Sequence, residues 1–244
     1  QVIVAGDEHQ MPPSNYFSKL IDGSIEDEDD IDEDFGEKIF EQGILSAESL
    51  LEFAEELKFE KKYLDFHYRS RHPFLIDFSN SAFYNNRLIP LPNSFDYKPI
   101  KYIQTNGTYS ENSNEIEAER VISIIENNIN KFPDGKYPTV GVATFNIHQR
   151  NLILSKINER RKFDKFRSFN EKILELEELG FFVKNLENIQ GDERDVIILS
   201  TTYGVNKDGN FNQRFGSVNH QKGYKLLNVI ITRAKYKIYV CTSI

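Results

Sequence analysis

The sequence predicts a doubly wound α/β fold, in which a parallel sheet carries helices on both faces. Two observations predict it. Short apolar runs of strand length alternate along the chain with segments whose apolar residues recur at helical spacing, which is typical of a parallel sheet covered on both faces. The chain has 244 residues, 39% of them hydrophobic, and is therefore long enough to bury one substantial core.

The first apolar run, residues 2–5, reads as a short buried strand. The prolines of Met11-Pro12-Pro13, which follow, can continue neither strand nor helix. Because the only methionine lies inside the chain, we expect residues 1–21 to be the tail of a preceding domain in a longer protein. A strand separated from its own sheet is expected to be disordered or to pair with another chain's edge.

Residues 22–37 form an acidic run with ten acids and no base. The net charge is -8, which taken whole argues against a nucleic-acid binder, but the chain outside the run carries +2. A run of like charge cannot bury enough apolar surface to offset its ordering entropy, so we expect residues 22–45 to be a disordered acidic linker. A nucleic-acid mimic or a docking tail is the alternative. Residues 46–244 would form the main domain.

Before residue 100 the pattern predicts a helix, a strand and a second helix. The first helix is marked by apolar residues at helical spacing: Leu50, Leu51, Ala54 and Leu57. Residues 63–66 are the strand candidate, and Pro73 suits the first turn of the second helix. That helix would bury Leu75, Phe78, Ala82 and Phe83.

The alternation continues to the end of the chain. Strands are expected at residues 100–104, 139–144, 181–184, 195–201 and 237–242. Helices are expected from Asn112, where Glu115 completes a pattern like a capping box, and at residues 149–160 and 226–234. The first of these helices would bury Ile116, Val121, Ile125 and Ile129. Residues 160–179, charged and helix-prone, read as an inserted hairpin or lid.

Composition excludes several classes of protein. Cys241 is the only cysteine, so no intramolecular disulfide forms, and a reducing, cytoplasmic setting is expected. No apolar run approaches the roughly 18 residues that a membrane-spanning helix needs, so no membrane partner is expected.

Polar groups flank several of the predicted strands: Asp7 to Gln10, Tyr68-Arg69, Thr144-Phe145-Asn146, Gln190 to Glu193 and Thr232-Arg233. Ligands of parallel α/β sheets bind beyond the carboxyl ends of the strands, so we expect these groups to gather at one edge of the sheet. An isolated arginine or tyrosine is usually a surface residue with a packed stem, so the argument depends on the ordered set.

The residue types in this set suit a triphosphate. A planar guanidinium bridges two phosphate oxygens and stabilises charge that develops during phosphoryl transfer, which makes Arg69 and Arg233 candidates. Gln10 is suited to orient a water or sense the terminal phosphate. Tyr68 offers a ring for a base, and Gly191 lets the backbone approach a ligand closely.

Four segments resemble, in order, motifs III, IV, V and VI of superfamily 1 helicases. They are Val-Ala-Gly-Asp-Glu-His-Gln-Met-Pro-Pro at 4–13, His-Tyr-Arg-Ser-Arg-His-Pro at 67–73, Gln-Gly-Asp-Glu at 190–193 and Leu-Asn-Val-Ile-Ile-Thr-Arg-Ala at 227–234. The details are most similar to the 1B branch that includes the nonsense-mediated-decay helicase. In having an acidic run between motifs III and IV, the chain also resembles very large bacterial members of this branch. The resemblance covers residues 2–242.

The resemblance implies that residues 46–244 are a second RecA-like motor domain of the P-loop NTPase type. Gln10 would couple the terminal phosphate of ATP to nucleic acid, and Arg69 and Arg233 would contact that phosphate. It further implies that Tyr68 stacks on adenine and that Glu193 binds the sugar. The expected partners are single-stranded nucleic acid and the first RecA-like domain of the same polypeptide. DNA and RNA stay open, and 5′ to 3′ movement follows only by analogy.

The resemblance places Thr144 on the nucleic-acid backbone, with Ser200 and Thr201 as weaker candidates for the same surface. The family's usual residues after that threonine are replaced by Phe145-Asn146. The chain has no Gly-x-x-x-x-Gly-Lys-Ser/Thr loop, so we expect the ligands of Mg²⁺, which accompanies ATP, to lie outside it. The fragment alone is therefore expected to be inactive, and no metal site is expected within it.

Two rival interpretations compete with a helicase motor. Asp7 and His9 superficially resemble a metallophosphoesterase metal loop, but Gln10 stands where that loop needs glycine and the other histidines lie in unrelated contexts. The second rival is a non-catalytic, helicase-like module kept for protein binding or regulation. The presence of Gln10, Arg69 and Arg233 argues against such degeneration.

Overall fold

The computed structural model describes residues 2–11, 49–92, 96–211, 213–219 and 223–244. The predicted acidic linker, residues 22–45, lies outside the described residues. The chain divides into two compact units, Gln1–Leu64 and Asp65–Ile244.

In the first unit the predicted helix is present and the predicted strand is absent. Helix α3, Leu50–Glu56, begins after Ser49, whose hydroxyl accepts a hydrogen bond from the Glu52 amide. Residues 2–5 adopt no strand, and Val2 and Ile3 are 72% and 83% exposed. The expectation of a buried strand is wrong here because nothing among the described residues pairs with this segment.

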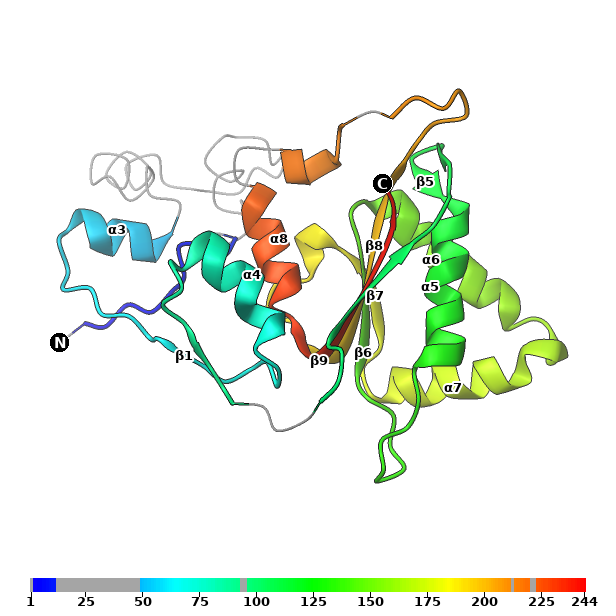
Figure 1. Ribbon diagram of the computed structural model, residues 1–244, viewed down its shortest axis with the longest axis horizontal. Coiled ribbons are helices and arrows are strands. Elements are labelled where there is room, and N and C mark those ends of the chain that lie inside the picture. The colour runs from blue at the N-terminus through cyan, green and yellow to red at the C-terminus, as the bar shows by residue number, and fades with distance from the viewer. Residues whose placement is uncertain (1, 12–48, 93–95, 212, 220–222) are drawn as a thin grey trace, which may run out of the picture. The chain divides into compact units, whose positions relative to one another are not determined.

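The second unit is built on a five-stranded, fully parallel sheet (Figure 1). The strands are β3 (Ile100–Gln104), β6 (Val140–Thr144), β7 (Phe182–Asn185), β8 (Arg194–Gly204) and β9 (Ala234–Ser243). Their order across the sheet is β3-β9-β8-β6-β7. All five predicted strands are confirmed within three residues at each end.

Helices cover both faces of this sheet, so the predicted doubly wound α/β fold is confirmed. Helices α5 (Glu115–Asn128), α6 (Ile147–Arg160) and α7 (Arg167–Glu178) lie on one face, and α4 (Phe74–Phe83) and α8 (Gly223–Ile231) lie on the other (Figure 1). The main core lies between α5, α6, α7 and the sheet, where Ile122, Ile125, Ile153, Val142 and Ile198 are fully buried.

Short elements complete the fold. β1 (Phe66–His67) pairs in parallel with β2 (Ile89–Pro90), and β4 (Tyr109–Ser110) pairs antiparallel with β5 (Ser113–Asn114). Three short 3₁₀ helices are η1 (Asp164–Phe166), η2 (Leu186–Asn188) and η3 (Gly216–Asn219). No described helix combines the length and apolar character needed to cross a bilayer.

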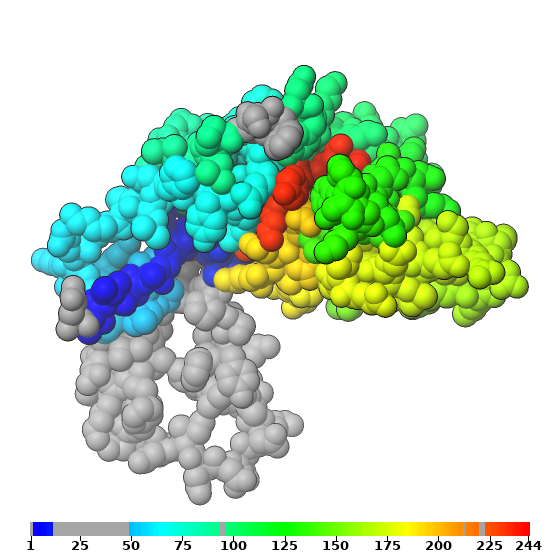
Figure 2. All heavy atoms as spheres, turned by 90° about the horizontal axis from the view of Figure 1, so that it is seen from below, coloured from blue at the N-terminus to red at the C-terminus, as the bar shows by residue number. Residues whose placement is uncertain are grey.

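Helix α7 overturns the expectation of a lid at residues 160–179. Phe169, Ile173 and Leu176 of α7 are buried in the main core. Figure 2 shows the yellow-green α7 as part of the continuous surface of the second unit. The charged residues that suggested a lid lie on the outer face of an amphipathic helix.

The start of α5 and the buried face of α4 differ from the prediction. α5 is capped by Asn114 rather than Asn112, because Asn112 lies in the β4–β5 turn with a φ of 61°. Ile116 is exposed because it lies five residues before Val121, off the buried face, whereas Val121, Ile125 and Ile129 are buried as predicted. α4 begins after Pro73 as predicted but buries Leu75, Ile76 and Ser79, and leaves Phe78 and Ala82 exposed.

The parallel strands give the sheet two chemically distinct edges. We call the edge at which β8 and β9 begin, near Arg194 and Ala234, the amino edge. The opposite edge, where β6, β8 and β9 end near Thr144, Gly204 and Ser243, is the carboxyl edge.

Candidate functional site

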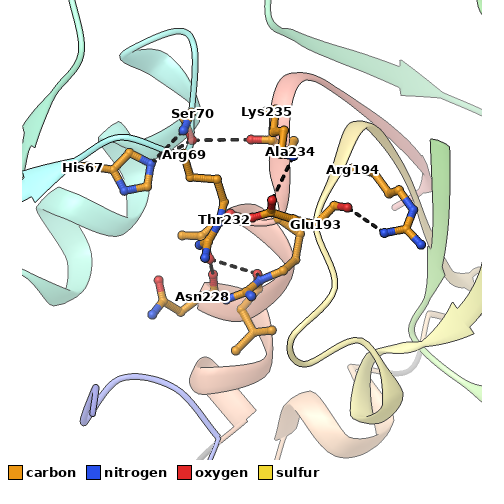
Figure 3. Close-up of polar contacts among 11 residues, drawn as sticks. His67, Arg69, Ser70, Glu193, Arg194, Asn228, Thr232, Ala234 and Lys235 are labelled. Carbon is orange, nitrogen blue, oxygen red and sulfur yellow. Dashed lines mark hydrogen bonds and ion pairs between the residues drawn. The ribbon is translucent and has the colours of Figure 1, made fainter. Parts of the chain in front are cut away.

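Three charged side chains meet at the amino edge. Arg69 donates from Nε to Glu193 Oε2 at 3.0 Å, and Lys235 Nζ lies 2.8 Å from Glu193 Oε1. Arg69 also donates from Nη1 to the Thr232 carbonyl oxygen at 3.5 Å. Figure 3 shows Glu193 between the two cations, which come from segments far apart in the sequence.

A tight turn after β1 holds Arg69 in this position. The Ser70 amide donates to Nε2 of His67 at 3.2 Å, and the Ser70 hydroxyl donates to the Ala234 carbonyl oxygen. The Arg71 amide then donates to the Lys235 carbonyl oxygen at 2.7 Å. The loop that carries Arg69 is therefore attached to the first residues of β9.

Arg233 lies in the turn between α8 and β9 and is only 3% exposed. Its Nε donates to the Val229 carbonyl oxygen at 2.9 Å. Its own carbonyl oxygen accepts from the Arg194 amide at 3.1 Å, where β8 begins. A guanidinium packed in this way has little freedom to rotate, so Arg233 is pre-positioned at the amino edge.

The electrostatics of the amino edge favour an anionic ligand. Hydrogen bonds from Lys235 and then from Arg69 lower the pKa of Glu193, which is therefore ionised at neutral pH. Burial, with a further contribution from the charge of Arg69, lowers the pKa of His67 to about 4, so His67 is neutral and able to accept from Ser70. Glu193 thus faces two cations, Arg69 and Lys235, and Arg233 lies at the same edge of the sheet.

Tyr68 and Gly191 stand beside this cluster in sequence. The Tyr68 ring is 75% exposed, so its face is open to a planar ligand. Gly191 has a φ of 85°, a conformation that side-chain-bearing residues rarely adopt, and a Cβ built there would meet no atom within 4 Å. The turn before Glu193 therefore requires glycine for its backbone and leaves open space beside it.

These residues fit ATP, the cofactor that the resemblance implies. Two cations meet on one carboxylate, Glu193, which suits exchange with a phosphate, and an open tyrosine ring suits a base. Among the described residues no group of three or more acidic, histidine or cysteine side chains is arranged to hold a metal ion.

The hydroxyls predicted to contact nucleic acid lie at the carboxyl edge instead. Thr144 is fully buried and donates to the Asn146 carbonyl oxygen at 2.7 Å. Ser200 is also fully buried, and Thr201 donates to Thr242 Oγ1 at 2.9 Å. The expectation that all flanking polar groups share one edge is wrong, because Glu193 and Arg233 precede their strands whereas Thr144 follows its strand.

Glu117 is a residue that sequence reasoning missed. It is fully buried in the first turn of α5 and accepts hydrogen bonds from the Thr202 amide at 3.0 Å and from the Ser200 hydroxyl at 3.2 Å. Burial raises its pKa to about 7, although these hydrogen bonds act in the opposite direction. Thr202 has a φ of 72°, a strained conformation for a β-branched residue, and its bond to Glu117 helps to hold it.

Sequence reasoning also missed Lys235 and Gln149. Lys235 lies two residues after Arg233, a spacing that offers a signal once Arg233 is a candidate. Gln149 is fully buried and bridges α6 to Asn114 and Ser200 at the carboxyl edge. Nothing in the local pattern distinguishes it from a surface glutamine.

Gln10 belongs to the first unit. Its side-chain amide donates to the Asp7 carboxylate at 2.7 Å, and its backbone amide donates to the Asp7 carbonyl oxygen. Asp7 and His9, the residues of the rival metal loop, lie in the same turn, where the His9 amide donates to Asp7 Oδ1. Asp7 is therefore engaged in ordering this turn.

Comparisons with known proteins agree with the motifs. A family model described as an AAA domain matches residues 46–244. A Mycoplasma pneumoniae protein named as the MG140 homolog, an uncharacterized ATP-dependent helicase, is 35% identical over 97% of this chain. The Mycoplasma genitalium protein MG140, with the same description, is 36% identical over 97% of the chain. The chain spans 20% of the length of each of these relatives.

A solved structure, the C-terminal domain of a possible DNA helicase from Lactobacillus plantarum WCFS1, is 15% identical. It covers 72% of this chain and 86% of its own length, with a TM-score of 0.34. The family match and the two mycoplasma relatives carry the assignment without it. The chain belongs to the AAA domain family as an ATP-dependent helicase-like domain, and the resemblance to superfamily 1 helicases is confirmed.

Proposed function

We propose that this chain is the second motor domain of an ATP-driven nucleic-acid helicase and that its amino edge faces the nucleotide. The observation that supports this most directly is the convergence of Arg69 and Lys235 on Glu193 at the edge where Arg233 is buried. Arg69 and Arg233 are the proposed contacts to the terminal phosphate, with the role of arginine fingers.

The ion pair between Arg69 and Glu193 is the part of the site that a nucleotide would rearrange. Arg69 is partly exposed, so its guanidinium is able to exchange a carboxylate partner for a phosphate at little cost. Glu193, released from Arg69, would bind the ribose while Lys235 keeps it oriented. Tyr68 would stack on adenine. Bound ATP supplies the phosphoanhydride bond whose hydrolysis drives the motor.

The rest of the catalytic machinery is proposed to come from a first motor domain. Gln10 would couple the terminal phosphate to nucleic acid, and the phosphate-binding loop and the Mg²⁺ ligands would lie in that domain. Residues 1–244 alone are therefore proposed to be inactive as an ATPase. Closure of two such domains around ATP would bring the arginines onto the phosphate.

Single-stranded nucleic acid is proposed to lie at the carboxyl edge. Thr144, Ser200 and Thr201 are the hydroxyls expected at this surface from the resemblance. Because Thr144 and Ser200 are buried, their proposed role is to hold the backbone of the edge, and direct contact would fall to the groups around them. The two ligands would then occupy opposite edges of one sheet.

The decisive experiment measures ATP hydrolysis by the longest natural polypeptide that carries this chain, with single-stranded DNA and RNA offered separately. Arg233→Ala should lower the stimulated rate by roughly 10²- to 10⁴-fold, because a charge at the transition state loses its partner. Arg167→Ala, in which a highly exposed arginine on α7 is removed, is the matched control and should leave the rate unchanged.

An Arg233→Ala protein as active as the wild type would contradict the assignment of the amino edge. A well-folded wild type that neither DNA nor RNA stimulates would instead support a regulatory, non-catalytic module.

A further inference from the structure

A pocket lined by aromatic and amide side chains opens at the carboxyl edge, beyond the end of β8. Its volume is about 600 Å³, within the range of roughly 300 to 1,000 Å³ that small-molecule sites occupy. Tyr109, Tyr203 and Phe211 supply its rings. Figure 1 shows the orange loop after β8 rising beside β5, and this loop forms one wall of the pocket.

The loop is a short hairpin with a defined shape. Val205 and Phe211 form an antiparallel bridge, and the Asn206 amide donates to the Asn210 carbonyl oxygen at 2.8 Å. Asn206 Oδ1 accepts from the Asp208 and Asn210 amides, and Gly209 provides the positive φ that the turn needs. Phe211 is thus presented from an ordered turn rather than from a free loop.

The hairpin is attached to the wall opposite it. The Tyr109 amide of β4 donates to the Val205 carbonyl oxygen at 2.8 Å. The Tyr109 hydroxyl donates to Asn112 Oδ1, which orients one amide of the lining. A backbone hydrogen bond therefore joins the two walls of the pocket.

The rings of the pocket divide into a support and an open part. Tyr203 is buried, with ring centroids 5.1 Å from Tyr109 and 5.5 Å from Phe215. Its contacts with these two rings account for the burial of Tyr203. Phe211 is 37% exposed and Tyr109 is half-buried, so both keep ring surface facing the pocket. Phe211 also packs on Phe215, with ring centroids 6.0 Å apart, and the rest of its ring lines the pocket.

The polar part of the lining suits a base and its backbone. Asn210 and Gln213 are exposed amides, each able to donate and accept, as the edge of a nucleobase requires. Arg214 adds an exposed positive charge suited to a phosphate, and none of the described residues that line the pocket is acidic. Flat rings, amides and a single arginine together match one nucleotide of a single strand better than an aliphatic or cationic ligand.

We propose that this pocket takes one unstacked base of single-stranded nucleic acid, with Phe211 and Tyr109 as stacking surfaces and Arg214 on an adjacent phosphate. The inference rests on the proposed function, because it names the base-binding part of the same carboxyl edge. Contacts of this kind tolerate every base, since each has a flat π-face. The pocket would thus add to the affinity for a single strand without adding sequence specificity.

The test compares two strands of equal length, oligothymidylate and an abasic deoxyribose-phosphate strand, by fluorescence anisotropy with the longest natural polypeptide that carries this chain. Phe211→Leu keeps the apolar bulk but removes the flat ring. It should weaken binding of oligothymidylate by roughly 5- to 100-fold, the range for loss of one stacked base, and leave the abasic strand unaffected. Phe211→Tyr should restore the affinity, and Phe163→Ala, at an exposed aromatic away from the pocket, is the control.

A fluorescent base analogue in the strand gives an independent readout. Its emission should rise when it leaves the stack of neighbouring bases to enter the pocket, and Phe211→Leu should reduce that rise. If the wild type binds oligothymidylate and Phe211→Leu changes neither the affinity nor the emission, the base pocket is excluded while the helicase function stands. If the wild type binds neither strand, the proposed nucleic-acid function fails and the pocket assignment fails with it.

Discussion

At the amino edge of the sheet, Arg69, Glu193 and Lys235 hold their charged atoms partly in solvent. At the carboxyl edge, Glu117, Gln149 and Ser200 form a fully buried polar network. Exposed ion pairs contribute little to stability, whereas a buried hydrogen-bonded network is costly to break. This difference indicates that the ion pairs of the amino edge can be exchanged at a low cost in free energy, whereas the hydrogen bonds of the carboxyl edge cannot. Substitutions at the two edges should therefore fail in different ways.

The largest expected effect is functional and belongs to the amino edge. Arg69→Ala in the longest natural polypeptide should lower the nucleic-acid-stimulated ATPase rate by roughly 10²- to 10³-fold, because Arg69 is a proposed phosphate contact. Its free energy of unfolding should change by less than about 1 kcal/mol, since the pair with Glu193 is partly exposed. Kinetic assays measure the ATPase rate, and urea titration measures the free energy of unfolding. A large loss of stability with intact activity would contradict the contrast drawn between the two edges.

The next effect is a loss of stability at the carboxyl edge. Gln149→Leu removes the acceptor of the Asn114 amide and the donors to the Asn114 carbonyl oxygen and Ser200 Oγ. Buried groups left without partners should lower the free energy of unfolding by roughly 2–4 kcal/mol. Urea titration of Gln149→Leu beside Arg150→Leu, a partly exposed neighbour on α6, measures it. Equal midpoints for the two variants would mean that the network is not a stabilising element.

The last effect, spread over several pH units, is a pH dependence of the free energy of unfolding. Burial raises the pKa of Glu117 from 4.5 to about 7, so the folded state keeps a proton that the unfolded state has released between these values. The stability that Glu117 contributes therefore falls as the pH rises from about 4.5 to 7. His67 acts oppositely below about 6.5, because its folded pKa is lowered to about 4.

The contribution of Glu117 is obtained by subtracting the free energy of unfolding of the wild type from that of Glu117→Gln at each pH. The difference should shift in favour of the variant by about 2–4 kcal/mol between pH 4.5 and 8. Unfolding free energies measured across this range check it. A difference that does not vary with pH would show that Glu117 is ionised in the folded protein.

The sequence predicted the sheet well because each strand is a compact apolar run between polar segments, as at residues 139–144 and 195–201. It failed at the amphipathic helices. Ile116 and Phe78 lie on the exposed side because each is out of phase with the buried residues of its helix, which are centred on Val121 in α5 and on Leu75 and Ser79 in α4.

For the candidate site, the sequence proposed the residues but not their arrangement, and their roles stay predictions. Motif order identified Arg69, Glu193 and Arg233, which the structure places at one edge. Which edge each residue occupies depends on whether it precedes or follows its strand, and that information was in the sequence. The buried partners Glu117 and Gln149 were beyond reach, because their roles depend on neighbours more than 30 residues away in the chain.

Strand β9 has a mechanical consequence. It begins at Ala234, directly after Arg233, and ends at Ser243, whose hydroxyl accepts from the Asn114 side chain at 2.9 Å. Ten residues of strand span about 33 Å and are held on both sides, by β3 and β8. Under the proposed function, a displacement of the buried guanidinium at one end would reach the far end through a strand that is hydrogen-bonded to a neighbour along each side.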